Sequence, residues 1–249
     1  MSHPDPIAFT IFGLEVRWYG ILIACGMLIA VLLSCKRASY HKLKEDDVLD
    51  VTLFMLPIGV IGARLYYVLF NLDYYDSLKS MLDIRSGGLA IHGGLLFGAA
   101  CVLILCKRKS INPLNMLDLF IPTVALAQAI GRWGNYFNGE AHGGPTDLPW
   151  AILVDGQMVH PTFLYESIWC LILFFALSYF DKNKRTAYGQ TFALYCIFYS
   201  VERFFVEALR TDSLMIGPFK QAQVISLCAI VFGIVLYIFA SKKYPISEE

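Results

Sequence analysis

Residues suited to binding an anion are concentrated in residues 131–144, directly after the apolar run from Leu114 to Ile130. This stretch contains five glycines together with Arg132, Asn135, Asn138, Glu140 and His142. An arginine guanidinium stays protonated when partly desolvated and grips a phosphate through two parallel hydrogen bonds. Polar groups at the end of an apolar run indicate a functional site. We expect the glycines to permit sharp turns or close approach of a ligand to the backbone.

A second polar stretch has helical spacing. Tyr199, Arg203, Glu207 and Arg210 are separated by four, four and three residues, which places them along one face of a helix. An internal ion pair between Arg203 and Glu207 that only rigidifies the helix end is an equally good interpretation of this pattern. The alternative is a second guanidinium for the same anion.

Further candidates lie near the predicted helix ends. His92 stands between two glycine pairs, His160-Pro161 precedes Tyr165-Glu166, and Tyr19 follows Trp18. Each has a structural alternative: His92 as a helix-packing residue and Tyr19 as an aromatic anchor at the lipid headgroups. Arg64 either binds a ligand or ties its helix to a neighbouring carboxylate or carbonyl.

Several chemistries are not supported. The chain lacks H-E-x-x-H, G-x-S-x-G, a phosphate-binding glycine loop followed by lysine, and an acidic cluster for Mg²⁺. The spacing of His92, His142, His160 and Glu140 matches no recognisable metal site, so we expect no metal and no cofactor.

Arg132 and Arg203 still need anionic partners in a membrane. A phospholipid phosphate is the most abundant anion at that depth.

Composition indicates a membrane protein. The 249 residues are 57% hydrophobic and 16% charged, with a mean hydropathy of +0.57. We predict an all-α integral membrane protein, a single polytopic domain of residues 1–249 with seven transmembrane helices. Residues 1–17 form an outer-surface segment and residues 134–162 an outer loop or cap. The predicted spans are Trp18–Cys35, Val48–Phe70, Leu89–Cys106, Leu114–Trp133, Phe163–Phe180, Tyr188–Glu207 and Ala222–Ser241.

Basic residues predict the orientation, because cytoplasmic loops collect Lys and Arg. With seven spans, one side holds Lys36, Arg37, Lys42, Lys44, Lys107, Arg108, Lys109, Lys182, Lys184, Arg185, Lys242 and Lys243. The other side holds Arg17, Lys79, Arg85, Arg210 and Lys220. We therefore expect an extracytoplasmic N-terminus, a retained first helix and a cytoplasmic C-terminus. The balance of 20 basic and 20 acidic residues gives no indication of nucleic acid.

The motifs resemble those of the bacterial phosphatidylglycerol:prolipoprotein diacylglyceryl transferase family. The resemblance rests on residues 131–140, Trp18-Tyr19-Gly20, the glycine box around His92, residues 160–166, and residues 199–212. It implies transfer of a diacylglyceryl group from phosphatidylglycerol to the lipobox cysteine thiol of a preprolipoprotein, forming a thioether and releasing glycerol 1-phosphate. This is the first step of lipoprotein maturation, at the extracytoplasmic face of the bacterial cytoplasmic (inner) membrane.

The resemblance also implies roles for the residues. His92 is the candidate base for the thiol, and Arg132 and Arg203 hold the leaving phosphate. Phosphatidylglycerol binding falls to Arg132, Arg203, Asn135, Asn138, Glu140, Gly143, Tyr19 and Tyr199, with His160, Glu166, Glu207 and Arg210 in support. Gly139 stands where other members carry glutamine, and Glu202 lies outside the family pattern.

Two other functions remain open from the residues alone. A polytopic transporter would place a polar pocket among its helices, but transporters tend to have internal repeats and midplane sites. We find no repeat in this chain, and its polar residues lie near the outer edge. A non-catalytic lipid-binding membrane protein could carry the same residue types.

Overall fold

A computed structural model describes residues 4–84 and 87–246 as two compact units. Unit 1 comprises residues 1–34 and 117–249, and unit 2 residues 35–116, each taken within the described ranges. Arg85, counted above in an outer loop, and residues 1–3 of the outer-surface segment lie outside the described residues. The long helices are α1 Trp18–Arg37, α2 Glu45–Leu69, α4 Ile91–Arg108, α5 Pro113–Asn138, α6 Thr162–Asn183, α7 Gln190–Leu209 and α8 Gln221–Lys243. The short helical segments are η1 Ala38–His41, η2 Leu72–Tyr74 and α3 Leu78–Leu82.

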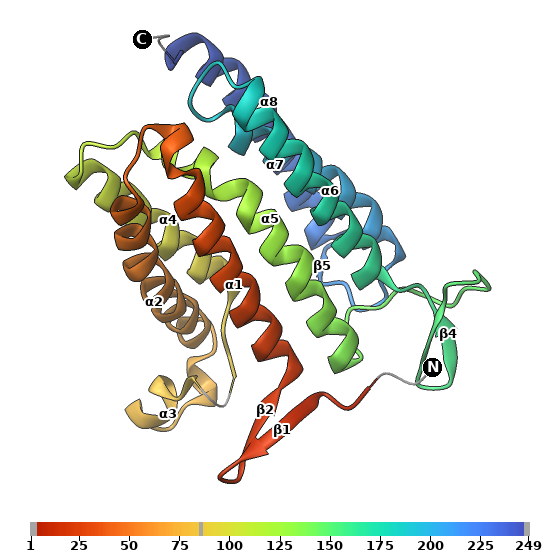
Figure 1. Ribbon diagram of the computed structural model, residues 1–249. Coiled ribbons are helices and arrows are strands. Elements are labelled where there is room, and N and C mark those ends of the chain that lie inside the picture. Colours follow the sequence, from red (N-terminus) through yellow and green to blue (C-terminus); the bar gives the residue numbers. More distant parts are fainter. Residues whose placement is uncertain (1–3, 85–86, 247–249) are drawn as a thin grey trace. The chain divides into compact units, whose positions relative to one another are not determined.

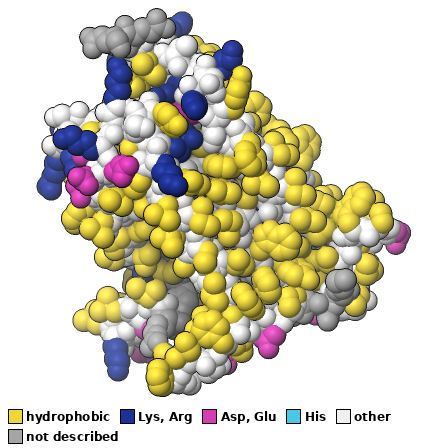
Figure 2. All heavy atoms as spheres, in the orientation of Figure 1, with side chains coloured by type: hydrophobic (Ala, Val, Ile, Leu, Met, Phe, Trp, Pro, Cys, Tyr) yellow, Lys and Arg dark blue, Asp and Glu magenta, His cyan; other side chains and the backbone are white. Residues whose placement is uncertain are grey.

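Among the described residues, six helices are long and apolar enough to cross a membrane: α1 with η1, α2, α4, α5, α6 and α8. The protein is therefore a mostly helical, multi-pass membrane protein. Figure 2 shows hydrophobic side chains over much of the visible sides of the helices. The exposed apolar residues include Leu28 and Leu32 of α1 and Val235 of α8. The remaining predicted span, Tyr188–Glu207, corresponds to α7, whose 20 residues include three charged ones, Glu202, Arg203 and Glu207.

Three antiparallel hairpins interrupt the helices of unit 1. Strands β1 Ile7–Ile11 and β2 Leu14–Arg17 pair in the predicted outer-surface segment. Strands β3 Ile152–Val154 and β4 Gln157–Val159 form the second hairpin, and β5 Met215–Ile216 and β6 Phe219–Lys220 form the third. All three lie at the end of unit 1 away from the C-terminus (Figure 1).

In unit 1, α7 packs against both α6 and α8 (Figure 1). Helix α1 approaches α5 closely, because a Cβ added to Gly26 would lie 3.1 Å from the backbone oxygen of Ala127. The ring of Tyr19 likewise occupies the space beside Gly134, because its Cδ2 would lie 2.2 Å from a Cβ added there. Both glycines therefore serve helix packing. For Gly134, we had expected a turn or a ligand at its backbone.

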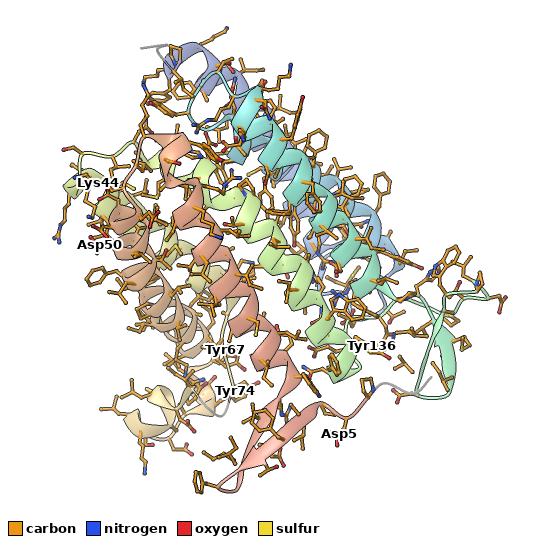
Figure 3. The ribbon with its side chains drawn as sticks, in the orientation of Figure 1. Asp5, Lys44, Asp50, Tyr67, Tyr74 and Tyr136 are labelled. Carbon is orange, nitrogen blue, oxygen red and sulfur yellow. The ribbon has the colours of Figure 1, made fainter. Side chains whose placement is uncertain are left out.

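Helix α5 continues beyond the predicted end at Trp133, so the predicted loop of residues 134–162 begins only after Asn138. Aromatic contacts explain the extension. Tyr136, at the end of α5 in Figure 3, stacks on Phe163 of α6 at 5.0 Å between ring centroids. Phe137 stacks on Trp18 of α1 at 5.2 Å. The extra turn buries these rings against neighbouring helices, which a local reading of polar residues cannot anticipate.

Both ends of α7 are held by side chains from other elements. At its beginning, Asp118 of α5 accepts hydrogen bonds from the backbone N–H of Gly189 at 2.6 Å and of Phe192 at 2.9 Å. Lys220 lies at the other end and donates from Nζ to the carbonyls of Glu207 and Arg210 at 2.8 and 2.7 Å. These contacts satisfy backbone groups that a helix leaves unpaired at its ends.

Unit 2 is built on α2 and α4, which pack through glycines. A Cβ on Gly93 would lie 2.3 Å from the oxygen of Gly62. Lys44 and Asp50 lie at one end of α2, with Tyr67 and Tyr74 at the other (Figure 3). At the first end, Lys109 contacts Asp50 at 2.6 Å and Asp47 at 2.9 Å. Hydrogen bonds to Asp50 and then Asp47 raise the pKa of Lys109 above its usual value.

The glycine packing predicts different costs for two substitutions on one helix. In Gly62→Ala, the new Cβ would meet Phe97 Cβ at 2.4 Å and the Gly93 oxygen at 2.8 Å, so we expect about 1–3 kcal/mol of destabilisation. Gly59→Ala is the matched control, since its nearest neighbour would be 3.5 Å away. Thermal unfolding in detergent measures both. Equal melting temperatures for the two variants would contradict this packing.

Candidate functional site

A buried carboxylate joins two arginines from different helices in unit 1. Glu166 of α6 is fully buried, and its Oε1 lies 2.9 Å from Arg203 Nη1 of α7. Its Oε2 lies 3.1 Å from Arg132 Nη1 of α5, a charge contact without the alignment of a hydrogen bond. The structure therefore brings together the two guanidinium groups that the sequence singled out.

The three helices place these groups at one depth. Arg132 lies six residues before the end of α5, Glu166 four residues after the start of α6, and Arg203 six residues before the end of α7. At 1.5 Å per residue, each lies about 6–9 Å inside its helix end. The start of α6 is fixed nearby, where the Thr162 hydroxyl donates a hydrogen bond to the Ala141 carbonyl.

Tyr199 and Glu207 complete the inner contacts of the arginines. Arg132 Nη2 donates to the Tyr199 hydroxyl at 3.0 Å, and Arg203 Nη2 lies 2.6 Å from Glu207 Oε2. The Arg203–Glu207 ion pair, one of the two interpretations of the helical spacing, is therefore present. The same guanidinium also reaches Glu166 on another helix, so the pair does more than rigidify the end of α7.

Arg210 lies at the outer edge of this cluster, one residue beyond α7. It binds Asp212 through two hydrogen bonds, from Nε at 2.9 Å and from Nη2 at 2.7 Å. This pairing lowers the pKa of Asp212 below its usual value. Arg210 also forms a β-bridge with Gly143. A Cβ on Gly143 would lie 2.7 Å from His160 Cβ, so this close approach requires glycine.

The remaining predicted residues of unit 1 have the following contacts. Asn138 Nδ2 donates to Glu140 Oε1 at 3.1 Å, while Asn138 Oδ1 is buried without a hydrogen-bond partner among the described residues. The Asn135 carbonyl accepts from the Glu140 N–H at 3.0 Å. His160 Nδ1 lies 3.3 Å from the Tyr165 hydroxyl, which also accepts a 2.9 Å hydrogen bond from Trp150 Nε1.

His92 belongs to unit 2, whereas Arg132, Glu166 and Arg203 belong to unit 1. His92 is the second residue of α4, is exposed, and has its ring 6.1 Å from that of Tyr66. Its catalytic role stays a prediction.

Arg64, also in unit 2, ties its helix to backbone carbonyls rather than to a carboxylate. It donates to the carbonyls of Ser80, Met81, Gly87 and Gly88 at 2.5–3.0 Å. Arg64 thereby holds the segment that leads into the glycine box around His92.

The described residues contain no group of three or more His, Cys, Asp or Glu side chains that could hold a metal ion. The seven cysteines are free.

Sequence reasoning missed two features of the site. It gave Glu166 a supporting role and did not predict its position between two arginines, because that position depends on contacts between helices. It also set Glu202 aside, although this residue is only 8% exposed and neither carboxyl oxygen has a hydrogen-bond partner among the described residues. The available signal was the number of charges: helices α6 and α7 carry three carboxylates here for the two arginines.

Comparison with known proteins agrees with the motifs. A family model described as prolipoprotein diacylglyceryl transferase matches residues 6–239. The chain belongs to this family. A phosphatidylglycerol–prolipoprotein diacylglyceryl transferase of Clostridioides difficile is 53% identical over 248 residues, which cover 98% of this chain and 100% of the relative.

Other family members align almost as completely. Proteins of the same name from Finegoldia magna and Staphylococcus epidermidis are 46% and 42% identical. The alignments cover 98% and 100% of this chain, and 99% and 94% of the relatives. The site residues of this family member therefore lie within the matched length.

The bridging position of Glu166 predicts a large effect on stability. Glu166→Gln leaves two partly buried guanidinium groups without their shared anion, so we expect a loss of about 3–5 kcal/mol. Chemical denaturation in detergent measures the loss. Glu15→Gln is the control, because Glu15 is exposed in β2. A Glu166→Gln variant as stable as the control would show that the bridge contributes nothing.

Proposed function

We propose that this transferase moves the diacylglyceryl group of phosphatidylglycerol to the lipobox cysteine thiol of a preprolipoprotein, forming a thioether and releasing glycerol 1-phosphate. The names of its relatives support both substrates. The observation that carries the proposal is the pair of arginines held on one buried carboxylate.

Arg132 and Arg203 are proposed to bind the headgroup phosphate and to stabilise it as it leaves. A guanidinium has five N–H donors. Among the described residues, Glu166, Tyr199 and Glu207 together make one contact with each of the two terminal nitrogens of each arginine. The remaining donors are held in place before substrate arrives, which favours stabilisation of charge that develops in the transition state.

The other residues have proposed roles around these arginines. Asn135, Asn138, Glu140, Gly143, Tyr19 and Tyr199 bind or orient phosphatidylglycerol, and His160, Glu166, Glu207 and Arg210 support them. The unpaired oxygen of Asn138 is suited to accept a hydroxyl hydrogen bond from the glycerol headgroup. His92 is proposed to take the thiol proton. A thiol of pKa about 8.5 needs only a modest base.

We also propose how the protein lies in the bacterial cytoplasmic membrane. Helix α7 is also proposed to span the membrane, and its Arg203 is accommodated because it pairs with Glu166 of α6 and with Glu207 of its own helix. The excess of Lys and Arg on one side supports a cytoplasmic C-terminus and an extracytoplasmic N-terminus. The two compact units then form one polytopic domain, with the site toward the extracytoplasmic face.

One experiment separates this function from the transporter and the non-catalytic lipid-binding protein. Purified protein is incubated with phosphatidylglycerol and a lipobox peptide, and the peptide is analysed by mass spectrometry. The proposal requires a diacylglyceryl adduct on the cysteine and release of glycerol 1-phosphate. A lipid-binding protein or a transporter would leave the peptide mass unchanged.

The phosphate role makes Arg132→Lys informative. Lysine keeps the charge but loses the planar fork, so we expect transfer to fall about 100-fold or more. The adduct assay measures the rate. Arg108→Lys, at the exposed last turn of α4, is the matched control and should keep full activity. Full activity of Arg132→Lys would refute binding of the phosphate by the guanidinium fork.

If His92 is the base, the loss of transfer rate in His92→Asn should depend on pH. We expect transfer to fall about 100-fold near neutral pH. The deficit should shrink as the pH approaches the thiol pKa of about 8.5, because the thiol then ionises without help. Initial rates from pH 6.5 to 9 test this. A variant that matches the wild-type rate at every pH in that range would show that His92 is a structural residue.

A further inference from the structure

Glu202 is a buried acid that the proposed mechanism does not yet use. It lies on α7 beside Arg203, is only 8% exposed, and has no hydrogen-bond partner for either carboxyl oxygen among the described residues. A buried, unpaired carboxylate has a large desolvation cost, which binding a proton removes. The two acids of the arginine cluster differ from Glu202, because Glu166 and Glu207 each contact a guanidinium.

Charged groups surround Glu202 from three helices. It interacts electrostatically with Glu166 of α6, Arg132 of α5 and its neighbour Arg203. Cys170 of α6 interacts with it as well. Helix α8, which packs against α7, carries no charged side chain before Lys242. Three acids, Glu166, Glu202 and Glu207, therefore lie around two arginines. Of these acids, only Glu166 and Glu207 contact a guanidinium directly within the described part of the chain.

We propose that Glu202 holds a proton in the resting enzyme and donates it to the phosphate that leaves during diacylglyceryl transfer. This inference rests on the proposed function and adds a catalytic acid to it. Glu202 interacts electrostatically with both of the arginines that are proposed to bind this phosphate.

The step balances without another reactant. The thiol loses its proton to the base, and the sulfur forms a bond with the terminal glycerol carbon of the diacylglyceryl group. The bond from this carbon to the phosphate oxygen breaks, and its electron pair stays on that oxygen. Glu202 gives its proton to the departing phosphate and becomes a carboxylate. The proton taken from the thiol then returns to Glu202 through water, which restores the resting enzyme.

A proton donor is useful here because the phosphate gains charge. The phosphodiester carries one negative charge, and the phosphate monoester that leaves would carry a second. Arg132 and Arg203 are already balanced by Glu166 and Glu207. A second charge in this buried site therefore lacks a counter-charge, and a proton from Glu202 removes the need for one.

Glu202→Gln tests the donor without a large change of shape. We expect kcat to fall about 100-fold while KM for phosphatidylglycerol stays within about threefold, because the arginines still bind the lipid. The ratio of wild-type to variant kcat should shrink as the pH rises, since wild-type Glu202 then loses its proton. Glu202→Asp should recover part of the rate, and Glu15→Gln is the exposed control.

A second substrate separates acid catalysis from a structural role. In an analogue with sulfur in place of the bridging oxygen, the leaving thiophosphate is a weaker base and needs no proton. We expect Glu202→Gln to approach wild-type rates with this analogue. An equal deficit with both substrates, or an unchanged kcat with phosphatidylglycerol at every pH, would overturn the inference. Failure of the wild-type enzyme to form any adduct would instead overturn the proposed function.

Discussion

The site depends on the burial of Glu166 between two arginines. A guanidinium inside a membrane must have an anionic partner, and one carboxylate here serves two of them. Because its partners come from α5 and α7, Glu166 joins three helices at one depth. The contacts that make these charged residues tolerable in the membrane therefore also fix the geometry of the proposed phosphate site.

The cluster is nearly neutral before any substrate arrives. Arg132 and Arg203 are matched by Glu166 and Glu207, so the proposed binding of a phosphate relies on oriented N–H groups rather than on excess charge. Such a site suits an enzyme that must release a phosphorylated product. Arg210, by contrast, is paired with Asp212 at the outer edge, where it also meets the backbone of Gly143 through a β-bridge.

Much of this structure follows from local sequence patterns. Apolar runs located the long helices, and the four-residue spacing of Arg203 and Glu207 offered their ion pair as one of two interpretations. Contacts between helices were not predictable in this way. The aromatic rings of Tyr136 and Phe137 extend α5 through a motif that resembled a loop. The bridging position of Glu166 and the carbonyl contacts of Arg64 likewise depend on residues distant in sequence.

The fixed ends of α7 have a consequence for how the enzyme can change shape. Asp118 holds the first turn and Lys220 holds the last carbonyls, so sliding or rolling of this helix would break contacts at both ends. Each residue of a helix turns by about 100°, and a one-residue insertion between Gln190 and Arg203 would swing the guanidinium away from Glu166. Entry of a lipid and a peptide therefore has to be accommodated by other segments, while α7 serves as the stationary reference for the reacting groups.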